Sequence, residues 1–339
     1  MAEVNIEQLL LDIDGIGNII ATDRQTAQTL AEKIEESKQA LKLAAEMSRI
    51  YYGQPLIITY SGGKDSDVLL NLAENYLGVG EFEVLNSHTT VDAPETVYHI
   101  RETFKRLEEK GIKATIDYHK QSDGTNITMW NLIVKKHMPP TRVVRYCCQQ
   151  LKEGGTPNRL CALGVRAAES SKRQGRDIFS TRGGDIQGRN FFSLEHALEV
   201  HQESQEIQDD AWDCTLIKNM KEKKDSIVNP IYDWLDSDIW DYIKQQNIKV
   251  NSLYERGYSR VGCIGCPLAG YKHKLKEFSD YPKYKALYIK AFDKMIQERK
   301  ERGMETQWTS GQECFDWWLE IDKYEVKGQM SIFDYMEEG

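Results

Sequence analysis

A short glycine-rich segment, residues 61–66 (SGGKDS), combines the residue types that hold phosphate groups. It lies between the apolar run 55–60 and the segment 65–76, in which apolar residues recur at helical spacing. A turn between a strand and a helix points free backbone N–H groups and the positive end of the helix dipole at an anion. The two glycines allow close backbone approach, the serine hydroxyls can donate, and Lys64 adds a positive charge. We therefore predict a nucleotide-phosphate site here.

Four of the seven cysteines stand in two close pairs, Cys147-Cys148 and Cys263-x-x-Cys266. In a reducing compartment, such pairs indicate metal or redox chemistry rather than structural disulfides. Two sulfurs at the second spacing can bind one metal, and the first pair supplies the other two thiolates of a four-sulfur site. Spacing alone allows zinc as well as an iron–sulfur cluster.

The remaining cysteines with a clear context are Cys161, Cys214 and Cys314. Cys161 lies in an apolar run, so we interpret it as a small core residue, with replacement of one of the four ligands as the alternative. We interpret Cys214 and Cys314 as structural.

Apolar runs and segments of helical periodicity alternate between residues 55 and 246. The expected strands are 55–60, 82–88, 114–119, 160–165 and 227–232, and the expected helices are 65–76, 94–110, 167–172 and 237–246. Residues 177–192 are expected to form a hairpin. This alternation implies parallel pairing through right-handed crossovers, and hence an α/β sheet covered on both faces.

The chain is expected to divide into four parts. These are a helical N-terminal extension (1–52), a nucleotide-binding α/β domain (53–250), a cysteine-containing helical region (251–325) and a flexible tail (326–339). In the third part, residues 282–301 carry apolar residues on one helical face, and Ser310-x-x-Glu313 fits a capping box.

The composition excludes some classes of function. The chain has 339 residues, 40% of them hydrophobic, and a net charge of -9, which argues against a general affinity for polyanions. Residues 1–20 lack the pattern of an export signal, and no apolar stretch is long enough to span a bilayer. We therefore expect a cytoplasmic protein with no membrane partner.

Four segments together resemble the superfamily of ATP pyrophosphatases and phosphoadenosine-phosphosulfate (PAPS) reductases. The segment 61–66 is similar to its pyrophosphate loop, and 86–96 (NSHTTVDAPET) is similar to its second strand and helix start. Residues 164–170 (GVRAAES) and 229–234 (NPIYDW) match two further elements, so the resemblance spans roughly residues 55–270. It implies a parallel-sheet, adenine-nucleotide alpha-hydrolase-like (Rossmann-like) core with helical additions at both ends.

The resemblance also implies which residues act on an adenine nucleotide. Arg166 and Arg173 would grip phosphate or sulfate oxygens, with a plain surface arginine as the alternative for each. Lys64 would neutralise a leaving pyrophosphate, and Asp65 would orient a metal or the loop unless it is only a helix cap. The implied catalytic residues are Lys64, Asp65 and Arg166, and the implied binding residues are Ser61, Gly62, Gly63, Lys64, Asp65, Ser66, Gly164, Arg166 and Arg173.

The complete loop favours ATP with Mg²⁺ over a sulfated nucleotide, as in the branch that resembles the sulfur-transfer enzyme of DNA phosphorothioation. That resemblance implies adenylation of an acceptor, release of pyrophosphate and displacement of AMP by sulfur. The double-cysteine pattern resembles iron–sulfur adenylyl-sulfate reductases and implies a [4Fe–4S] cluster, with zinc as the alternative. A PAPS or adenylyl-sulfate reductase that produces sulfite is the second hypothesis. The motif Glu313-Cys314-Phe315 only partly matches the reductases' Glu-Cys-Gly. A non-catalytic nucleotide-binding module of a defence or mobile-element complex is the third.

Several partners follow from these hypotheses. A nucleic acid is a candidate acceptor, a sulfur-donor protein is implied, and residues 329–334 (QMSIFD) resemble peptides that bind the bacterial sliding clamp. The alternative for this peptide is packing on its own domain. Local basic groups would line an approach for a polyanion, or else form an ordinary solvated surface. They are Lys135, Lys136, Arg142, Arg145, Lys172, Arg173, Arg176 and Arg182.

Overall fold

The computed structural model describes residues 28–152, 156–181, 190–206 and 214–326, without the side chains of 171–172 and 320–326. The strands are β1 (Leu56–Thr59), β2 (Phe82–Ser87), β3 (Ala114–Asp117), β4 (Leu160–Ala162), β5 (Phe179–Thr181), β6 (Phe191–Phe192) and β7 (Ser226–Val228). The helices are α2 (Leu30–Met47), η1 (Ser48–Tyr52), α3 (Lys64–Tyr76), α4 (Pro94–Glu109), α5 (Met129–Lys136), α6 (Tyr146–Leu151), η2 (Ala167–Glu169), α7 (Ser171–Gln174), α8 (Leu194–Glu206), α9 (Thr215–Lys221), α10 (Asp236–Gln245), α11 (Tyr271–Asp280), α12 (Pro282–Glu301) and α13 (Gly311–Val326).

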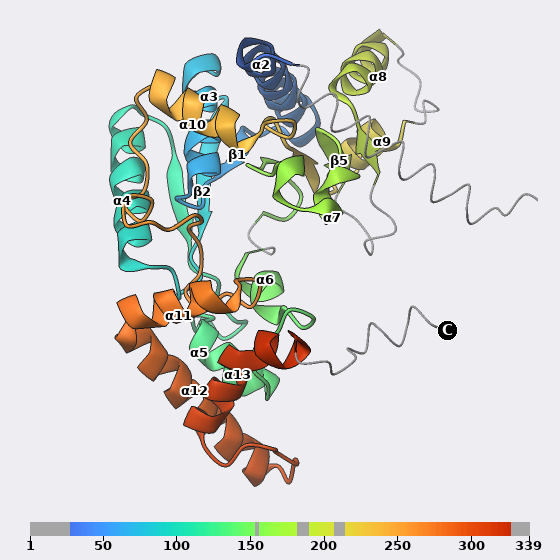
Figure 1. The fold of residues 1–339 in the computed structure, drawn as a ribbon. Coiled ribbons are helices and arrows are strands. Elements are labelled where there is room, and N and C mark those ends of the chain that lie inside the picture. Colours follow the sequence, from blue (N-terminus) through green and yellow to red (C-terminus); the bar gives the residue numbers. More distant parts are fainter. Residues whose placement is uncertain (1–27, 153–155, 182–189, 207–213, 327–339) are drawn as a thin grey trace, which may run out of the picture. The chain divides into compact units, whose positions relative to one another are not determined.

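The seven strands form one sheet in the order β3-β2-β1-β4-β7-β5-β6. β1 pairs in parallel with β2 and β4, and β4 pairs in parallel with β7. β5 is antiparallel to β7 and to β6. The expectation of a mainly parallel α/β sheet flanked by helices is therefore confirmed, with an antiparallel hairpin at one edge (Figure 1).

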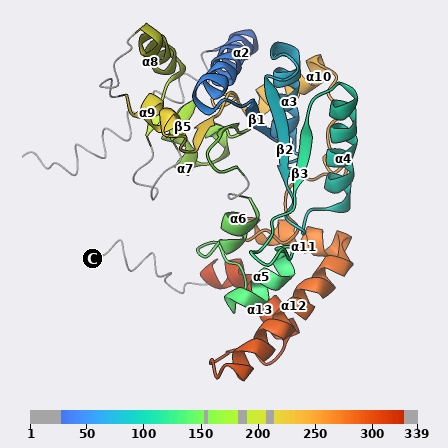
Figure 2. The same ribbon diagram turned by 180° about the vertical axis from the view of Figure 1, so that it is seen from behind.

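The strand residues explain why the sheet is covered on both faces. β1 buries three of its four residues, and all of β4 is buried. Near-continuous burial of this kind is expected for parallel strands between layers of helices. Figure 2 shows α4 beside β2 and β3, and its Ile100, Phe104 and Leu107 enter the same hydrophobic core as Phe82 and Val84 of β2.

Several sequence predictions differ from the structure in length. The strand expected at 227–232 is β7, Ser226–Val228, and residues 230–233 form turns. The helix expected at 167–172 is a 3-10 turn followed by the short α7. The predicted hairpin is present as β5 and β6, while its connection at 182–189 lies outside the described residues.

Contacts between Cα atoms divide the chain into two compact units. The first holds residues 1–86, 98–116 and 156–261, and it contains most of the sheet. The second holds residues 87–97, 117–155 and 262–339, with α5, α6, α11, α12 and α13. In this second unit α12 packs against α13 and α5. Neither unit is one continuous segment of the chain.

The second unit has an aromatic core of its own. Its members contact one another with ring centroids 4.9 to 6.5 Å apart, and they are Phe278, Tyr288, Phe292, Phe315 and Trp318. Each ring buries a large apolar area and prefers tilted or edge-on contacts, so this cluster holds α11, α12 and α13 together.

No helix in the described ranges is apolar over a length that could cross a bilayer.

Candidate functional site

The segment 61–66 forms a tight turn between β1 and α3. Gly62 has a φ of +73°, a left-handed conformation that favours glycine, and its carbonyl accepts a hydrogen bond of 3.2 Å from Asn251 Nδ2. The Ser66 hydroxyl accepts from Gly63 N at 3.2 Å and donates to Gly63 O at 2.8 Å. The Ser61 hydroxyl is 3.2 Å from the Ser66 hydroxyl. The turn is thus held from inside by its own serine and from outside by Asn251.

Four charged side chains of the first unit meet at this turn, and we call them the loop cluster: Lys64, Asp65, Arg166 and Asp236. Lys64 Nζ lies 2.6 Å from Asp236 Oδ1 and 3.3 Å from Asp65 Oδ2. Arg166 donates from Nε to Asp65 at 2.6 Å and from Nη2 to Asp236 at 3.1 Å. The two cations are almost fully buried, while Asp236 is exposed. Asp236 therefore closes the cluster on its solvent side.

The charges of the cluster act on the acidity of Asp236. Burial alone would raise the pKa of this carboxyl, but the hydrogen bond and charge of Lys64, followed by those of Arg166, bring its pKa below the ordinary value. The carboxylate is therefore ionised near neutrality and competes with any other anion for both cations.

Gly164 lies against the backbone of the turn. A Cβ atom at this position would meet the carbonyl carbon and oxygen of Asp65 at 3.2 Å and the amide nitrogen of Ser66 at 3.4 Å. Backbone atoms cannot move away as a flexible side chain can. Glycine therefore favours this close approach between the chain after β4 and the start of α3, because a larger residue would press on the backbone.

The amide of Lys64, at the first turn of α3, donates to the Tyr254 hydroxyl at 2.9 Å. Burial raises the pKa of Tyr254, so the phenol stays protonated. Its ring stands edge-on to Trp240 at a centroid distance of 5.3 Å.

One turn further along α3, Asp67 is buried without a cation of fixed charge. Its Oδ1 accepts from the Tyr60 hydroxyl at 2.6 Å and lies 2.9 Å from His99 Nε2. Its Oδ2 is buried without a hydrogen-bond partner among the described residues. Burial raises the pKa of this carboxyl, although the hydrogen bond from His99 acts in the opposite direction. Asp67 supports the turn from behind.

Arg173 does not join the loop cluster. Its guanidinium pairs with Glu169, which also accepts from the Arg166 amide at 3.0 Å. Arg173 therefore orders the chain that follows Arg166, and its role in nucleotide binding stays a prediction.

In the second unit, four cysteines line one cavity of about 30 Å³, which we call the cysteine pocket: Cys147, Cys148, Cys263 and Cys266. The first two are on α6, and the other two are in the turn before α11. The sequence pairs Cys147-Cys148 and Cys263-x-x-Cys266 are thus brought together across more than 100 residues.

Only glycine can occupy position 265 within the cysteine turn. Gly265 has a φ of +70°, and a Cβ there would lie 2.7 Å from Phe278 and 2.8 Å from Trp318. The Gly265 amide donates to Glu277 at 2.9 Å, and the Tyr288 hydroxyl donates to the carbonyl of Ile264 at 2.9 Å. The turn is therefore seated on the aromatic core of the unit.

The thiols of the pocket are weakly acidic in this arrangement. A hydrogen bond with Cys148 and burial raise the pKa of Cys147, and burial raises the pKa of Cys263 to about 11. Lys152 also lines the pocket, and the charge of Cys263 raises the pKa of this lysine. Four thiols are a suitable donor set for a metal ion, because a bound metal favours their deprotonated form.

The donor set and the space of the cysteine pocket determine which metal centre it can hold. Among the described residues, no group of three or more His, Cys, Asp or Glu side chains stands closely enough to hold an ion without movement. The cavity of about 30 Å³ is that of a few water molecules, each of which needs roughly 10–15 Å³. The donor set therefore suits a thiolate-bound metal, and the space suits one ion more closely than a four-iron cluster.

The other three cysteines stay outside the pocket. Cys161 is buried in β4, and its sulfur lies 3.2 Å from the Thr156 hydroxyl. Cys314 is fully buried, and burial raises its pKa to about 12. Cys214 caps α9 and packs against the hydrophobic core. All three have the surroundings of structural residues.

Two residues of the loop site were not expected from the sequence, namely Asp236 and Tyr254. Asp236 opens α10 directly after the segment 229–234, so an acidic helix start beside a strand end was the available signal. Tyr254 gave none, because its contact with Lys64 joins residues 190 positions apart.

Two of the predicted basic groups line different cavities of the second unit. Arg145 lines the cysteine pocket, and Lys135 lines a separate cavity of the second unit. Arg182, the side chain of Lys172 and the clamp-like peptide 329–334 lie outside the described residues.

The fold and the phosphate-binding turn define an α/β nucleotide-binding protein. The sequence matches the phosphoadenosine phosphosulfate reductase domain over residues 55–269, so the chain belongs to the PAPS reductase family. The matched region includes the loop cluster and all four cysteines of the cysteine pocket. Members of this family are enzymes.

The curated relatives are distant. The chain is 25% identical to an uncharacterized protein of Methanocaldococcus jannaschii over 232 residues, 68% of this chain and 40% of that protein. A second protein of the same organism is 22% identical, with 72% of this chain and 47% of that protein covered. The chain thus spans less than half the length of both. It is 24% identical to the adenosine 5'-phosphosulfate reductase of Staphylococcus haemolyticus, covering 63% of this chain and 71% of that enzyme.

Solved structures of similar fold are also remote. The PAPS reductase of Candida auris is 14% identical, with a TM-score of 0.38 and coverage of 65% of this chain and 87% of that chain. The U34-tRNA thiolase NcsA of Methanococcus maripaludis, solved with its [4Fe-4S] cluster, is 14% identical, with a TM-score of 0.36 and coverage of 79% and 82%. No functional conclusion follows from likenesses at this level. The assignment to the DNA phosphorothioation branch stays a prediction.

Proposed function

We propose that this PAPS reductase-family protein cleaves ATP between the α- and β-phosphates and adenylates an acceptor for sulfur transfer. The observation that carries the proposal is the convergence of Lys64 and Arg166 on the turn that follows β1. Two buried cations beside a helix N-terminus suit the several charges of a triphosphate.

In the proposed reaction an oxygen of the acceptor attacks the α-phosphorus of ATP. The bond from this phosphorus to the bridging oxygen breaks, and pyrophosphate leaves with its electron pair. Lys64 and the turn amides hold the pyrophosphate, and Arg166 neutralises charge that develops on the α-phosphate. A sulfur nucleophile then bonds to the acceptor atom and releases AMP. Mg²⁺, when bound with ATP, would screen the phosphate oxygens.

For Lys64 and Arg166 to reach phosphate, their pairs with Asp236 must be exchanged. Asp236 is exposed and sits at the solvent side of the cluster, so its carboxylate can turn away without unfolding the site. Asp65 is more enclosed and keeps Arg166 in place through the bond to Nε. We assign Asp65 the orientation of Arg166.

We further propose that the four cysteines of the cysteine pocket hold a thiolate-ligated metal centre, a [4Fe–4S] cluster by family resemblance. Zinc is the second candidate, favoured by the small volume of the cavity. When bound, either centre would keep four thiolates deprotonated at neutral pH. Protein purified without oxygen should be brown, with absorbance at about 400 nm for a cluster, and colourless with one zinc ion otherwise.

The test of the nucleotide chemistry is pyrophosphate release from ATP by anaerobically purified protein, with candidate acceptors and a sulfide source. Release that depends on ATP supports the proposal. Sulfite release from adenylyl sulfate or PAPS, without pyrophosphate release from ATP, would replace it with the reductase. Nucleotide binding without either product would leave only a non-catalytic module.

The reductase alternative needs a reachable thiolate, and the structure gives it little support. Cys314, in the partial Glu-Cys-Gly match, is fully buried, and its pKa is raised to about 12. A thiol in such surroundings is a poor nucleophile. A Cys314→Ala variant that loses sulfite production would nevertheless favour the reductase.

The acceptor and the sulfur donor are part of the proposal. A nucleic acid is the acceptor that we propose, and a sulfur-donor protein supplies the sulfur nucleophile. A chain that ends at Lys327 tests the clamp-like peptide 329–334. Equal binding of purified sliding clamp by the full and the shortened chains would exclude this peptide as the contact.

A further inference from the structure

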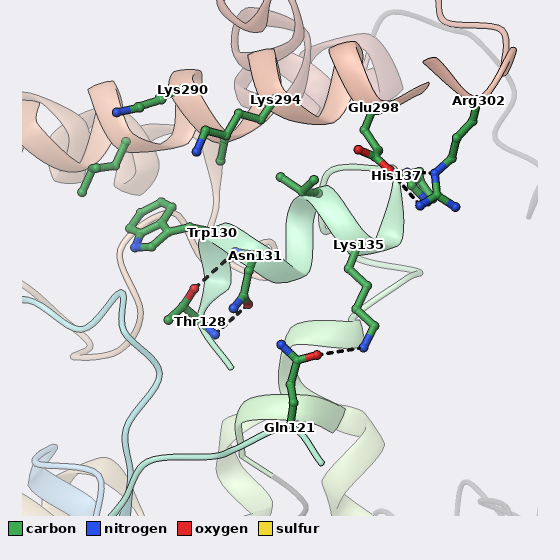
Figure 3. Close-up of a pocket in the computed structure, with 13 residues that line it drawn as sticks. Gln121, Thr128, Trp130, Asn131, Lys135, His137, Lys290, Lys294, Glu298 and Arg302 are labelled. Carbon is green, nitrogen blue, oxygen red and sulfur yellow. Dashed lines mark hydrogen bonds and ion pairs between the residues drawn. The ribbon is translucent and has the colours of Figure 1, made fainter. Parts of the chain in front are cut away.

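The second unit contains a second cavity, far larger than the cysteine pocket. It has a volume of about 820 Å³ and lies between α5 and α12. Figure 3 shows Trp130 on α5 beside Lys290 and Lys294 on α12, while the Lys135 side chain points toward Gln121. Pockets of roughly 300–1,000 Å³ are the size that encloses small organic ligands or a short stretch of polymer. We call this cavity the α5–α12 groove.

The groove is basic, in contrast to the chain as a whole. Four fixed cations line it, Lys135, Lys290, Lys294 and Arg302, against the single carboxylate of Glu298. The net charge of the whole chain is -9. A positive groove on an acidic protein concentrates one kind of ligand, namely anions, at one place on the surface.

Most of this positive charge is available to a ligand. Glu298 is taken by Arg302, whose Nε donates to it at 2.7 Å. Lys135 donates to the Gln121 side chain at 3.3 Å, and its charge also acts on Asp123. Lys290 and Lys294 are exposed, and neither has a hydrogen-bond or ion-pair partner in the part of the chain that the structure describes.

The spacing of the charges fits a chain of phosphates. Lys290 and Lys294 are one turn apart on the same face of α12, which is about 6 Å along the helix axis at 1.5 Å per residue. Arg302 continues the same line beyond Glu298. A row of cations along a helix suits a polymer with regularly spaced charges better than one compact anion.

An aromatic ring lies on the opposite wall. Trp130 is half-buried, and its ring makes a T-shaped contact with Tyr288 at a centroid distance of 5.1 Å and an angle of 75°. His137, at the end of α5, adds a second ring, and its Nδ1 is buried without a hydrogen-bond partner among the described residues. Aromatic rings beside a cationic track are the combination that binds single-stranded nucleic acid, because bases stack while phosphates pair.

We propose that the α5–α12 groove binds single-stranded nucleic acid, with phosphates along Lys290 and Lys294 and a base against Trp130. This site lies wholly in the second unit and does not rest on the nucleotide chemistry of the loop cluster. In a duplex the base faces are already stacked on one another and cannot stack on Trp130. The carboxylates of an acidic peptide could pair with the lysines but would not stack on the indole ring.

The test is the fluorescence anisotropy of a labelled single-stranded oligonucleotide titrated with the full chain at several salt concentrations. The double substitution Lys290→Glu and Lys294→Glu should weaken binding on the order of tenfold and reduce the salt slope by roughly 1.4, about 0.7 for each lost phosphate contact. The matched control is Lys272→Glu with Lys300→Glu, which makes the same charge change at two exposed lysines outside the groove. The control should bind within about twofold of the wild type.

Trp130→Leu should weaken binding roughly fivefold or more, and Trp130→Phe should retain most of it. If Trp130→Leu does not fold, the Lys290→Glu and Lys294→Glu double variant still tests the proposal, because both lysines are exposed and their substitution should not disturb folding. Three results would each overturn the proposal. The first is an equal loss of affinity in the two double lysine variants, and the second is equal affinity for a duplex. The third is displacement of the oligonucleotide by polyglutamate or AMP as effectively as by unlabelled oligonucleotide. Lys64→Met should bind the oligonucleotide normally, so failure of the ATP chemistry would leave this result intact.

Discussion

The loop cluster and the cysteine pocket differ in how their charges are balanced. The loop cluster places two buried cations against two carboxylates, so its charges are balanced by contacts of 2.6 to 3.3 Å within the protein. The cysteine pocket gathers four sulfurs. A hydrogen bond with Cys148 and burial raise the pKa of Cys147, and burial raises the pKa of Cys263. The first site balances its own charges, whereas the second has one cation, Lys152, for four sulfurs. A bound metal would stabilise its thiolates further.

This difference shows what each site contributes. Ion pairs within the loop cluster are exchangeable, since an incoming phosphate can replace one carboxylate at each cation. Thiols with a raised pKa lose their protons near neutral pH only when a metal ion binds the sulfurs. Metal binding then stabilises the surrounding fold. We therefore expect the loop cluster to govern turnover and the cysteine pocket to govern the integrity of the second unit.

The largest effect is expected at Lys64. Lys64→Met should reduce pyrophosphate release from ATP by roughly 10²–10³-fold, because it removes a preorganised charge at the leaving group. The melting temperature should change little, since Asp65 and Asp236 keep Arg166 as a partner. Lys105→Met, at an exposed lysine of α4, is the matched control. Unchanged pyrophosphate release in Lys64→Met would remove this lysine from the chemistry.

Cys263→Ser tests the cysteine pocket, where we expect a loss of bound metal. Loss of one of four thiolates should reduce bound metal by about tenfold or more, measured by elemental analysis of anaerobically purified protein. The control is Cys214→Ser, at a cysteine of the first unit outside the pocket. Equal metal content in the two variants would show that the cysteine pocket is not the metal site.

Gly164→Ala tests how tightly the turn is packed. The added methyl group would press on the Asp65 and Ser66 backbone, so the free energy of unfolding should fall by about 1–3 kcal/mol, as measured by urea titration. Gly175→Ala is the matched control in the same unit, because nothing lies within 4 Å of its Cβ position and its φ is negative. A loss as large in the control would mean that the contact with the turn is not the cause.

The smallest effect is a pH dependence at Asp67, the buried carboxyl behind the turn. Its pKa is raised by burial, so the folded state keeps this proton at pH values where the unfolded state has lost it. The contribution of Asp67 to stability is therefore greatest below its unfolded pKa, about 3.9, and falls as the pH rises toward the folded pKa. Asp67→Asn keeps the acceptor for Tyr60 and cannot ionise.

The free energy of unfolding of Asp67→Asn, measured relative to the wild type, should thus increase as the pH rises from below about 4 toward 7. Asp241→Asn, at an exposed carboxylate of α10, should show no such trend. A flat difference for Asp67→Asn across the same pH series would contradict the raised pKa.

Much of the fold could be predicted because its signals are local. The apolar run before the glycines gave β1, the helical spacing after them gave α3, and proline at position 94 marked the start of α4. The helices α5, α6 and α11 were not expected. Each has ten residues or fewer, and their stability comes from tertiary packing rather than from a long periodic pattern.

The candidate sites divide in the same way. The residues of the turn and the two cysteine pairs were visible as motifs, and the structure brings the four cysteines to one cavity. The contacts of Asp236 and Tyr254 with Lys64 were not predicted, because they cross 172 and 190 residues of chain. The metal and nucleotide roles of the motif residues remain predictions.

The hydrogen bond between Tyr254 and the amide of Lys64 gives the loop a built-in optical reporter. Any anion that takes this amide must compete with the phenol, and the phenol ring stands edge-on to Trp240, which is 37% exposed. Displacement of Tyr254 would change the surroundings of that indole. The intrinsic emission of Trp240, isolated by a Trp240→Phe difference spectrum, should therefore follow occupancy of the turn without any added label.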